Sequence, residues 1–367
     1  MRFVVAVLLA SVCFGTTGAA QALGPDADPV SIGAARILIG GGALALVAGL
    51  MAWRRRSVVA SGAPGGVATG PATGVAAGRP IGRAAGRAER ATGVRRRHPR
   101  SIAFAIAIGA VGVLAYQPAF FAGTASNGVA VGTVVALGSA PVITGALDWA
   151  LRRRFPGRRW LVATAIATTG VAVLAVATDP SQASSNPLGI VASVAAGASY
   201  AVYTLAAKHL LDRGWSPTGS MGALFGVAAV ASLPILLLTD ASWLATGPGL
   251  AMALWLGLVA TTLAYVLFGV GLAGLAPAVV STLTLAEPLT ASVLGVLVLG
   301  ETLAAGSVLG LVILGAGILV LASSRCRRSN VRSMAWTSSS SPGSGSTPRR
   351  GTTSSPSSKS RGTAPIR

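Results

Sequence analysis

Residues 276–323 read APAVVSTLTLAEPLTASVLGVLVLGETLAAGSVLGLVILGAGILVLAS, and Glu287 and Glu301 are their only charged residues. The apolar stretch on each side of Glu301 exceeds the 18 or so residues that indicate a membrane-spanning helix. Two transmembrane spans are therefore predicted in this stretch, at 276–299 and 303–323.

The same pattern recurs along the chain of 367 residues, which is 52% hydrophobic and 10% charged, with a mean hydropathy of +0.70. Eight further spans are predicted, at 3–23, 31–53, 101–122, 127–149, 160–178, 188–207, 218–238 and 249–271. All should be helices, because an open sheet would leave unpaired backbone groups in hydrocarbon. The fold class predicted is all-α integral membrane, with about ten transmembrane helices.

The net charge of +20 is distributed by side of the membrane. The connections 24–30, 123–126, 179–187, 239–248 and 300–302 contain no Lys or Arg, and all but 123–126 contain acidic residues, whereas the alternate connections contain most of the basic residues. Positive charge is retained in the cytoplasm, so both termini are expected there. The preference for Arg over Lys and the 48 Gly are typical of a GC-rich bacterial genome, which indicates the bacterial inner membrane. Nucleic acid is not an expected partner, because no aromatic residues are interleaved with the basic ones.

Two segments between or after the spans have a different composition. Residues 57–100 and 324–367 are rich in Gly, Ser, Pro and Arg and are predicted to be a disordered basic linker and a disordered basic tail, both cytoplasmic. Residues 1–22 also fit a signal peptide with a cleavage site at Ala20-Gln21-Ala22, and cleavage would leave nine helices in the same orientation. The internal repeat described next favours a retained first span.

The two halves of the chain resemble each other. Ala140-Pro141-Val142-Ile143-Thr144 resembles Glu287-Pro288-Leu289-Thr290-Ala291, and Ala115-Tyr116 matches Ala264-Tyr265 at similar distances before the two prolines. Five spans per half is an odd number, so the second copy (188–323) must enter the bilayer from the side opposite to the first (1–56 and 101–178). Inverted repeats around a central site are typical of secondary transporters.

Several short motifs resemble, in order and spacing, the EamA-type branch of the drug/metabolite transporter superfamily. They are Cys13-Phe14-Gly15-Thr16-Thr17-Gly18, Gly33-Ala34-Ala35-Arg36, Tyr116-Gln117-Pro118-Ala119, Ala140-Pro141, Glu287-Pro288 and Leu299-Gly300-Glu301. The resemblance covers about 1–56 and 101–322 and implies two five-helix halves, export of metabolites or amphiphilic compounds, and proton coupling in many members. The long 57–100 linker departs from the family pattern, and the tail has no counterpart there.

Glu287 and Arg36 are the charged candidates for a transport site. An acidic side chain near the middle of a span costs roughly 2.5–3.5 kcal/mol on insertion scales, so a partner, protonation or a wet cavity must compensate. Glu287 is read either as a coupling or substrate-binding carboxylate or as a structurally paired one. Arg36 is read either as a cavity residue that binds an anionic group or Glu287, or as a side chain that snorkels to the interface.

Other polar or irregular positions complete the candidate site. Tyr116, Gln117, Tyr203 and Tyr265 are expected to face the bundle, either for packing or for substrate contact. Helix breaks are predicted at Pro118, Pro141 and Pro288. Asp148 and Trp149 are expected to anchor a span at the interface. Gly306 and Gly310 predict either tight packing within the bundle or a dimer seam, with a homodimer as the resulting partner.

The residues favour a secondary transporter of a small organic solute, without cofactor, metal or enzymatic activity. Cys13 and Cys326 have no CxxC spacing, and His98 and His209 lie in basic loops. No GxxxxGK[ST] run for ATP is present in the sequence. The alternative is an integral membrane scaffold or regulatory subunit, which would have no central cavity.

Overall fold

The computed structural model of the protein describes residues 1–61, 99–153, 155–178 and 186–337. It divides into two compact units, Met1–Arg325 and Cys326–Arg367, and everything below concerns the first unit. Most of the predicted linker and tail lies outside the described residues. Where they are described, at 57–61, 99–100 and 324–337, they are helical and not disordered as predicted, because the adjoining helices continue into them.

Ten helical segments of the described residues are long and apolar enough to cross a membrane, which confirms the predicted all-α membrane fold. Six helices form the first seven spans, because α4 contains two of them. They are α1 (Arg2–Ala22), α2 (Pro29–Ser61), α4 (Pro99–Arg152), α5 (Arg158–Thr178), α6 (Pro187–Asp212) and α7 (Pro217–Leu238). The eighth span comprises α8 (Gly247–Leu254), η3 (Trp255–Leu263) and α9 (Ala264–Gly274). The ninth comprises α10 (Pro277–Leu283), η4 (Thr284–Ala286) and α11 (Glu287–Leu299), and the tenth lies in α12 (Ala305–Thr337).

Several of these helices begin where their sequence dictates. Asn186, Ser216 and Thr246 each accept a hydrogen bond from a backbone N–H of the first turn, and a proline follows each cap at N1 or N2 of the helix. A capping side chain satisfies a backbone donor that has no partner within the helix, and proline has no N–H to satisfy.

The turn within α4 lies at Gly128 and not in the predicted loop 123–126. Gly128 has φ 77° and ψ 156°, a conformation that is essentially restricted to glycine. The helix continues past Thr124 because Asn127, which is 1% exposed, is held at the start of α6. Its side-chain N–H₂ donates to Asn186 O at 3.1 Å, and its side-chain oxygen accepts from Asn186 N at 2.6 Å.

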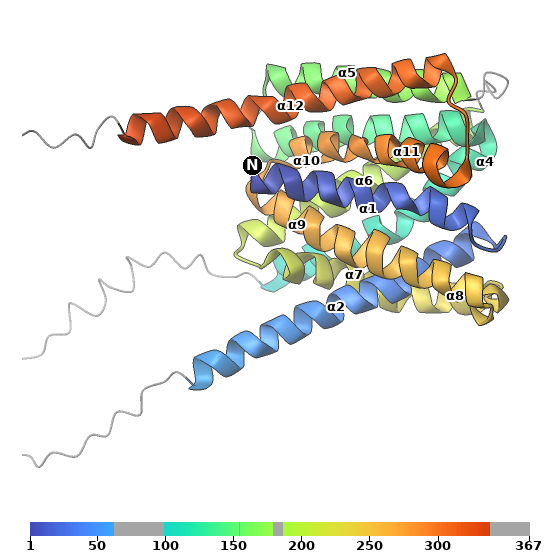
Figure 1. Cartoon of the computed structure of the whole chain (residues 1–367). Coiled ribbons are helices and arrows are strands. Elements are labelled where there is room, and N and C mark those ends of the chain that lie inside the picture. Colours follow the sequence, from blue (N-terminus) through green and yellow to red (C-terminus); the bar gives the residue numbers. More distant parts are fainter. Residues whose placement is uncertain (62–98, 154, 179–185, 338–367) are drawn as a thin grey trace, which may run out of the picture. The chain divides into compact units, whose positions relative to one another are not determined.

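The helices pack in pairs that join distant parts of the sequence. α2 packs on α7, α1 packs on η3, α9 and α11, and α4 packs on α6. α5 and the membrane-spanning part of α12 run side by side (Figure 1) and approach closely: a Cβ built on Gly310 would lie 2.5 Å from Leu174 N, and one on Gly306 would lie 2.8 Å from Ala177 Cβ. The Gly306/Gly310 face therefore serves packing within the bundle, and the alternative that it forms a dimer seam is wrong.

Two spans are irregular: the eighth, which is predicted as a plain helix, and the ninth, in which a break is predicted at Pro288. Residues 255–263 form a π-helix, in which the hydroxyls of Thr261 and Thr262 donate to Leu256 O at 2.8 Å and Gly257 O at 3.1 Å. In the ninth span, the three-residue 3₁₀ turn η4 comes directly before Glu287-Pro288, as the break predicted at Pro288 requires.

The breaks predicted at Pro118 and Pro141 are absent. Both residues lie inside α4, whose only non-helical backbone angles are at Gly128. Membrane helices tolerate proline when neighbouring groups satisfy the freed backbone. Beside Pro141, the Thr144 hydroxyl donates to Ala140 O at 2.7 Å.

Candidate functional site

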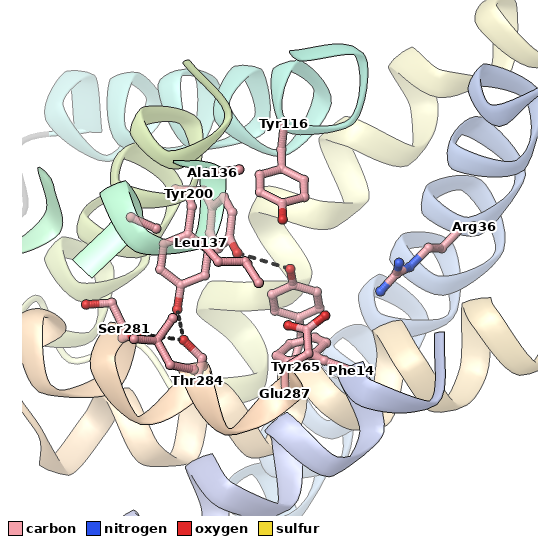
Figure 2. A pocket seen from close by; sticks show the side chains of 13 residues that line it. Phe14, Arg36, Tyr116, Ala136, Leu137, Tyr200, Tyr265, Ser281, Thr284 and Glu287 are labelled. Carbon is pink, nitrogen blue, oxygen red and sulfur yellow. Dashed lines mark hydrogen bonds between the residues drawn. The ribbon is translucent and has the colours of Figure 1, made fainter. Parts of the chain in front are cut away.

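All four tyrosines of the chain line one cavity inside the bundle. The cavity has a volume of about 70 Å³ and receives side chains from α1, α2, both spans of α4, α6, α9, α10, η4 and α11. Figure 2 shows Tyr116, Tyr265, Glu287 and Arg36 approaching it from different helices. A second cavity of about 40 Å³ shares Arg36 and three of the tyrosines and adds Gln117, Phe225 and Thr261 to the lining.

The six residues predicted from the sequence are therefore all brought together. Glu287, Arg36, Tyr116, Tyr203 and Tyr265 line the larger cavity, and Gln117 lines the smaller one. They arise from five different spans, so only the folded bundle could show that they meet.

Glu287 sits at the first turn of α11, next to Pro288. Its carboxylate faces the cavity (Figure 2), and within the described part of the chain it makes no ion pair and accepts no side-chain or backbone hydrogen bond. A carboxylate inside a membrane protein is costly without a partner. The two carboxylate oxygens of Glu287 are therefore available to bind a ligand or a proton.

Arg36 lies across the cavity from Glu287 and is anchored on the π-helical span. Its Nε donates to Thr261 Oγ1 at 3.0 Å and its Nη2 donates to Ala260 O at 2.9 Å. The reading in which Arg36 snorkels to the interface is therefore wrong. Both acceptors are neutral, so neither compensates the positive charge, and no Arg36–Glu287 ion pair is present among the described residues.

Hydroxyl groups connect the walls of the cavity. Tyr203 and Tyr265 share a hydrogen bond of 3.1 Å between their hydroxyls, which joins α6 to α9. The Tyr200 hydroxyl lies 3.0 Å from Thr284 Oγ1, which joins α6 to η4. Phe225 packs on Tyr265 with ring centroids 4.0 Å apart. The cavity is thus lined mainly by aromatic rings and hydroxyl groups, with one positively charged residue, Arg36, and one acidic residue, Glu287.

The positions that match between the two halves of the sequence also meet here. Tyr116 and Tyr265 both line the larger cavity, and so do Ala140 and Glu287. Each matched pair therefore contributes one residue from each half of the chain to the same space.

Comparisons with known proteins identify the family of this chain and a solved structure with the same fold. Residues 187–323 match the model of the EamA-like transporter family. The "Uncharacterized transporter YwfM" of Bacillus subtilis (strain 168) is 36% identical over 317 residues, which are 86% of this chain and 92% of that protein. The chain belongs to the EamA-like transporter family. A protein of known crystal structure shares the fold, with a TM-score of 0.64 and 17% identity over 89% of this chain and 98% of its own length.

This EamA-like transporter is thus a multi-pass membrane protein that transports a solute, and the scaffold alternative is set aside. Among the described residues, no group of three or more His, Cys, Asp or Glu is arranged to hold a metal ion. Asp148 is not in the cavity: it lies near the end of α4 and pairs with Arg152. The neighbouring Trp149 is 53% exposed, as expected for an interfacial residue.

Among the aromatic and hydroxyl-bearing residues that line the larger cavity, four are not predicted from the sequence: Phe14, Tyr200, Ser281 and Thr284. Tyr200 could have been found, because it lies three residues before Tyr203 and so shares its helix face. Thr284 likewise lies three residues before Glu287. Phe14 and Ser281 carry no comparable signal, since small hydroxyl and apolar residues are common throughout these spans.

Proposed function

We propose that this EamA-like transporter exports a small organic solute bearing a protonated amine across the bacterial inner membrane. The amine is bound by the Glu287 carboxylate. The observation that carries the proposal is that this carboxylate faces the cavity without an ion-pair or hydrogen-bond partner among the described residues, while Arg36 is occupied by neutral acceptors.

The surroundings of Glu287 favour a cation over an anion. Tyrosine and phenylalanine rings attract a cation placed over their faces, and Phe14, Tyr116 and Tyr265 share the cavity with the carboxylate. An anionic solute would be repelled by Glu287. Its only charged attraction in the lining would come from Arg36, whose Nε and Nη2 already donate to the π-helical span.

Arg36 also limits how many positive charges the cavity can hold. A guanidinium fixed in the same low-dielectric space repels additional cations. Glu287 therefore accommodates either one protonated amine or one proton, but not both. Exclusive occupancy of this kind couples export of the solute to entry of a proton, because the carrier returns only after the solute has been replaced.

Alternating access is supported by the arrangement of the two halves. The matched positions Tyr116 and Tyr265 approach one cavity from different halves, as a pseudo-twofold axis in the membrane plane requires. The described connections that contain Asp26, Asp28, Asp240 and Glu301 lack basic residues, whereas those with Arg54, Arg100, Arg158 and Arg213 alternate with them. By the positive-inside rule the basic side is cytoplasmic, together with both termini.

The test is transport in proteoliposomes with an imposed pH gradient, screening amino acids, nucleosides and cationic dyes. An acidic lumen should drive accumulation of the solute for the wild-type protein. Glu287→Gln should abolish gradient-driven accumulation, whereas the matched change Glu301→Gln, outside the cavity, should leave it intact.

Two results would contradict the proposal. Transport that is unchanged by Glu287→Gln at every pH would remove both the binding and the coupling role of this carboxylate. A solute without a positive charge, carried at the same rate by wild type and Glu287→Gln, would exclude the amine-bearing substrate class.

A further inference from the structure

A cluster of charged side chains ties three helices together at one end of the bundle. Arg152 Nε lies 2.6 Å from Asp148 Oδ1 within α4, and Arg152 Nη2 lies 2.7 Å from Asp212 Oδ2 at the end of α6. Lys208 Nζ lies 3.7 Å from Asp212 Oδ1 and donates to Leu272 O of α9 at 2.8 Å. The four side chains therefore connect α4, α6 and α9 in series.

The same three helices also line the cavity, with residues that lie closer to the N-terminal end of each helix than the cluster does. α4 contributes Ala140, α6 contributes Tyr203 and α9 contributes Tyr265, and each helix then continues to the charged cluster at its C-terminal end. Phe268, which lies on α9 between Tyr265 and Leu272, is fully buried, and so are Leu210 and Leu272 at the level of the cluster. The cluster and this apolar layer thus stand between the cavity and one face of the membrane.

The cluster is only partly exposed to solvent. The side chain of Asp148 is 6% exposed and that of Lys208 is 12% exposed, whereas those of Arg152 and Asp212 are 36% and 43% exposed. A buried carboxylate is stable when it is paired, and it becomes unfavourable when the pair is broken. Separating these charges would therefore require water to reach Asp148.

The opposite end of the bundle is built differently. All three ion pairs of the described residues belong to this cluster. At the other end, the Asp28 and Asp240 carboxylates accept backbone N–H groups from Ser31 at 3.0 Å and from Ser242 at 2.9 Å, and Ser31 Oγ donates to Asp240 O at 2.8 Å. In α11, which runs to that end, Gly295 is the one buried residue. That end is held by neutral hydrogen bonds and by an apolar cluster around the buried Trp243. Among the described residues, ion pairs are confined to the end that bears Arg152.

We infer that Asp148, Arg152, Lys208 and Asp212 form an ionic gate, which closes one side of the cavity in this conformation and separates when the carrier opens to that side. The gate joins a helix of the first half, α4, to two helices of the second half, α6 and α9. A relative movement of the halves must therefore break it. By the charge distribution, the gated side is the cytoplasmic side. The inference rests on the proposed alternating access.

The test measures access to the cavity, so it does not depend on the identity of the solute. A cysteine is placed in the lining as Ala140→Cys in the full-length protein with Cys13→Ala and Cys326→Ala, and a membrane-impermeant maleimide is added on the side that bears Arg152. Arg152→Gln and Asp212→Asn should each raise the rate of labelling about tenfold, as a tenfold shift of a two-state equilibrium predicts. Arg159→Gln, the same charge change at an exposed residue of the same end, should not.

A second experiment holds the gate closed with a covalent crosslink. In the same background, Arg152→Cys with Asp212→Cys is joined by a short bis-methanethiosulfonate reagent, which should suppress labelling of Ala140→Cys from this side. A reducing agent, removed before the maleimide is added, should restore labelling. Labelling that is unaffected by both charge variants, or that persists in the crosslinked protein, would overturn the gate. Neither result would bear on the role of Glu287.

Discussion

At the scale of single residues, the site depends on Arg36 and Glu287 being separated. Thr261 and Ala260 hold the guanidinium on the π-helical span, so it does not neutralise the carboxylate on the other side of the cavity. The fork of the guanidinium matters here, because two donors reach two acceptors in different directions. Lysine carries the same charge but presents it at a single nitrogen.

Arg36→Lys should therefore weaken the protein without changing its charge. The ammonium group can replace one of the two hydrogen bonds, so we expect a loss of stability of about 1 kcal/mol. The measurement is the thermal unfolding midpoint of the purified protein in detergent. An unchanged midpoint would show that the contacts of Arg36 with Thr261 and Ala260 contribute nothing to folding.

At the scale of elements, the contact between α5 and α12 requires residues without side chains. A Cβ on Gly310 would meet the backbone of Leu174 at 2.5 Å and 2.7 Å, and a Cβ on Gly317 would meet Ala167 N at 2.6 Å. Backbone atoms cannot move aside as a flexible side chain can, so these positions are strict. Gly315, on the same helix, meets nothing within 4 Å.

Gly310→Ala should destabilise the protein, whereas Gly315→Ala should not. Forcing an extra methyl group into a well-packed interface typically costs about 1–3 kcal/mol. At Gly315 the same change leaves the packing intact and favours the helix by up to about 1 kcal/mol. Thermal unfolding of the two variants provides the comparison, and equal midpoints would refute the close α5–α12 packing.

The hydropathy of the sequence predicts the membrane-spanning helices, but not the turns and irregular segments within them. The ten spans are predictable because each is long and apolar, with at most one charged residue. The turn at Gly128 was placed too early because the polar residues before it suggested a loop, whereas Asn127 is held by a contact with Asn186, 59 residues away. The π-helix of residues 255–263 has no marker in the sequence, since its stabilising partners include Gly40 of α2.

At the scale of the whole molecule, ten spans place the start of α1 and the membrane-embedded end of α12 on the same side of the bilayer. The sequence predicted this arrangement through its alternating charges. It could not predict how closely the candidate residues would approach, because Arg36, Tyr116, Tyr203, Tyr265 and Glu287 lie on five spans. The hydrogen bond between Tyr200 and Thr284 could not be predicted either, because the two residues are 84 positions apart.

Single cysteines at the two ends of the bundle should label from opposite sides. In a background with Cys13→Ala and Cys326→Ala, Ser57→Cys should react with an impermeant maleimide only from the cytoplasmic side, and Asn186→Cys only from the outside. Intact cells and inverted membrane vesicles give the two exposures. Labelling of both positions from the same side would contradict the ten-helix topology.

Because the protein has four tyrosines and all of them border one cavity, any phenol-selective signal is a reporter of the transport pathway. Ring-deuterated or fluorinated tyrosine can be incorporated biosynthetically without altering the sequence. Magnetic resonance of the labelled rings would then follow solute binding and conformational exchange free of background from the rest of the chain.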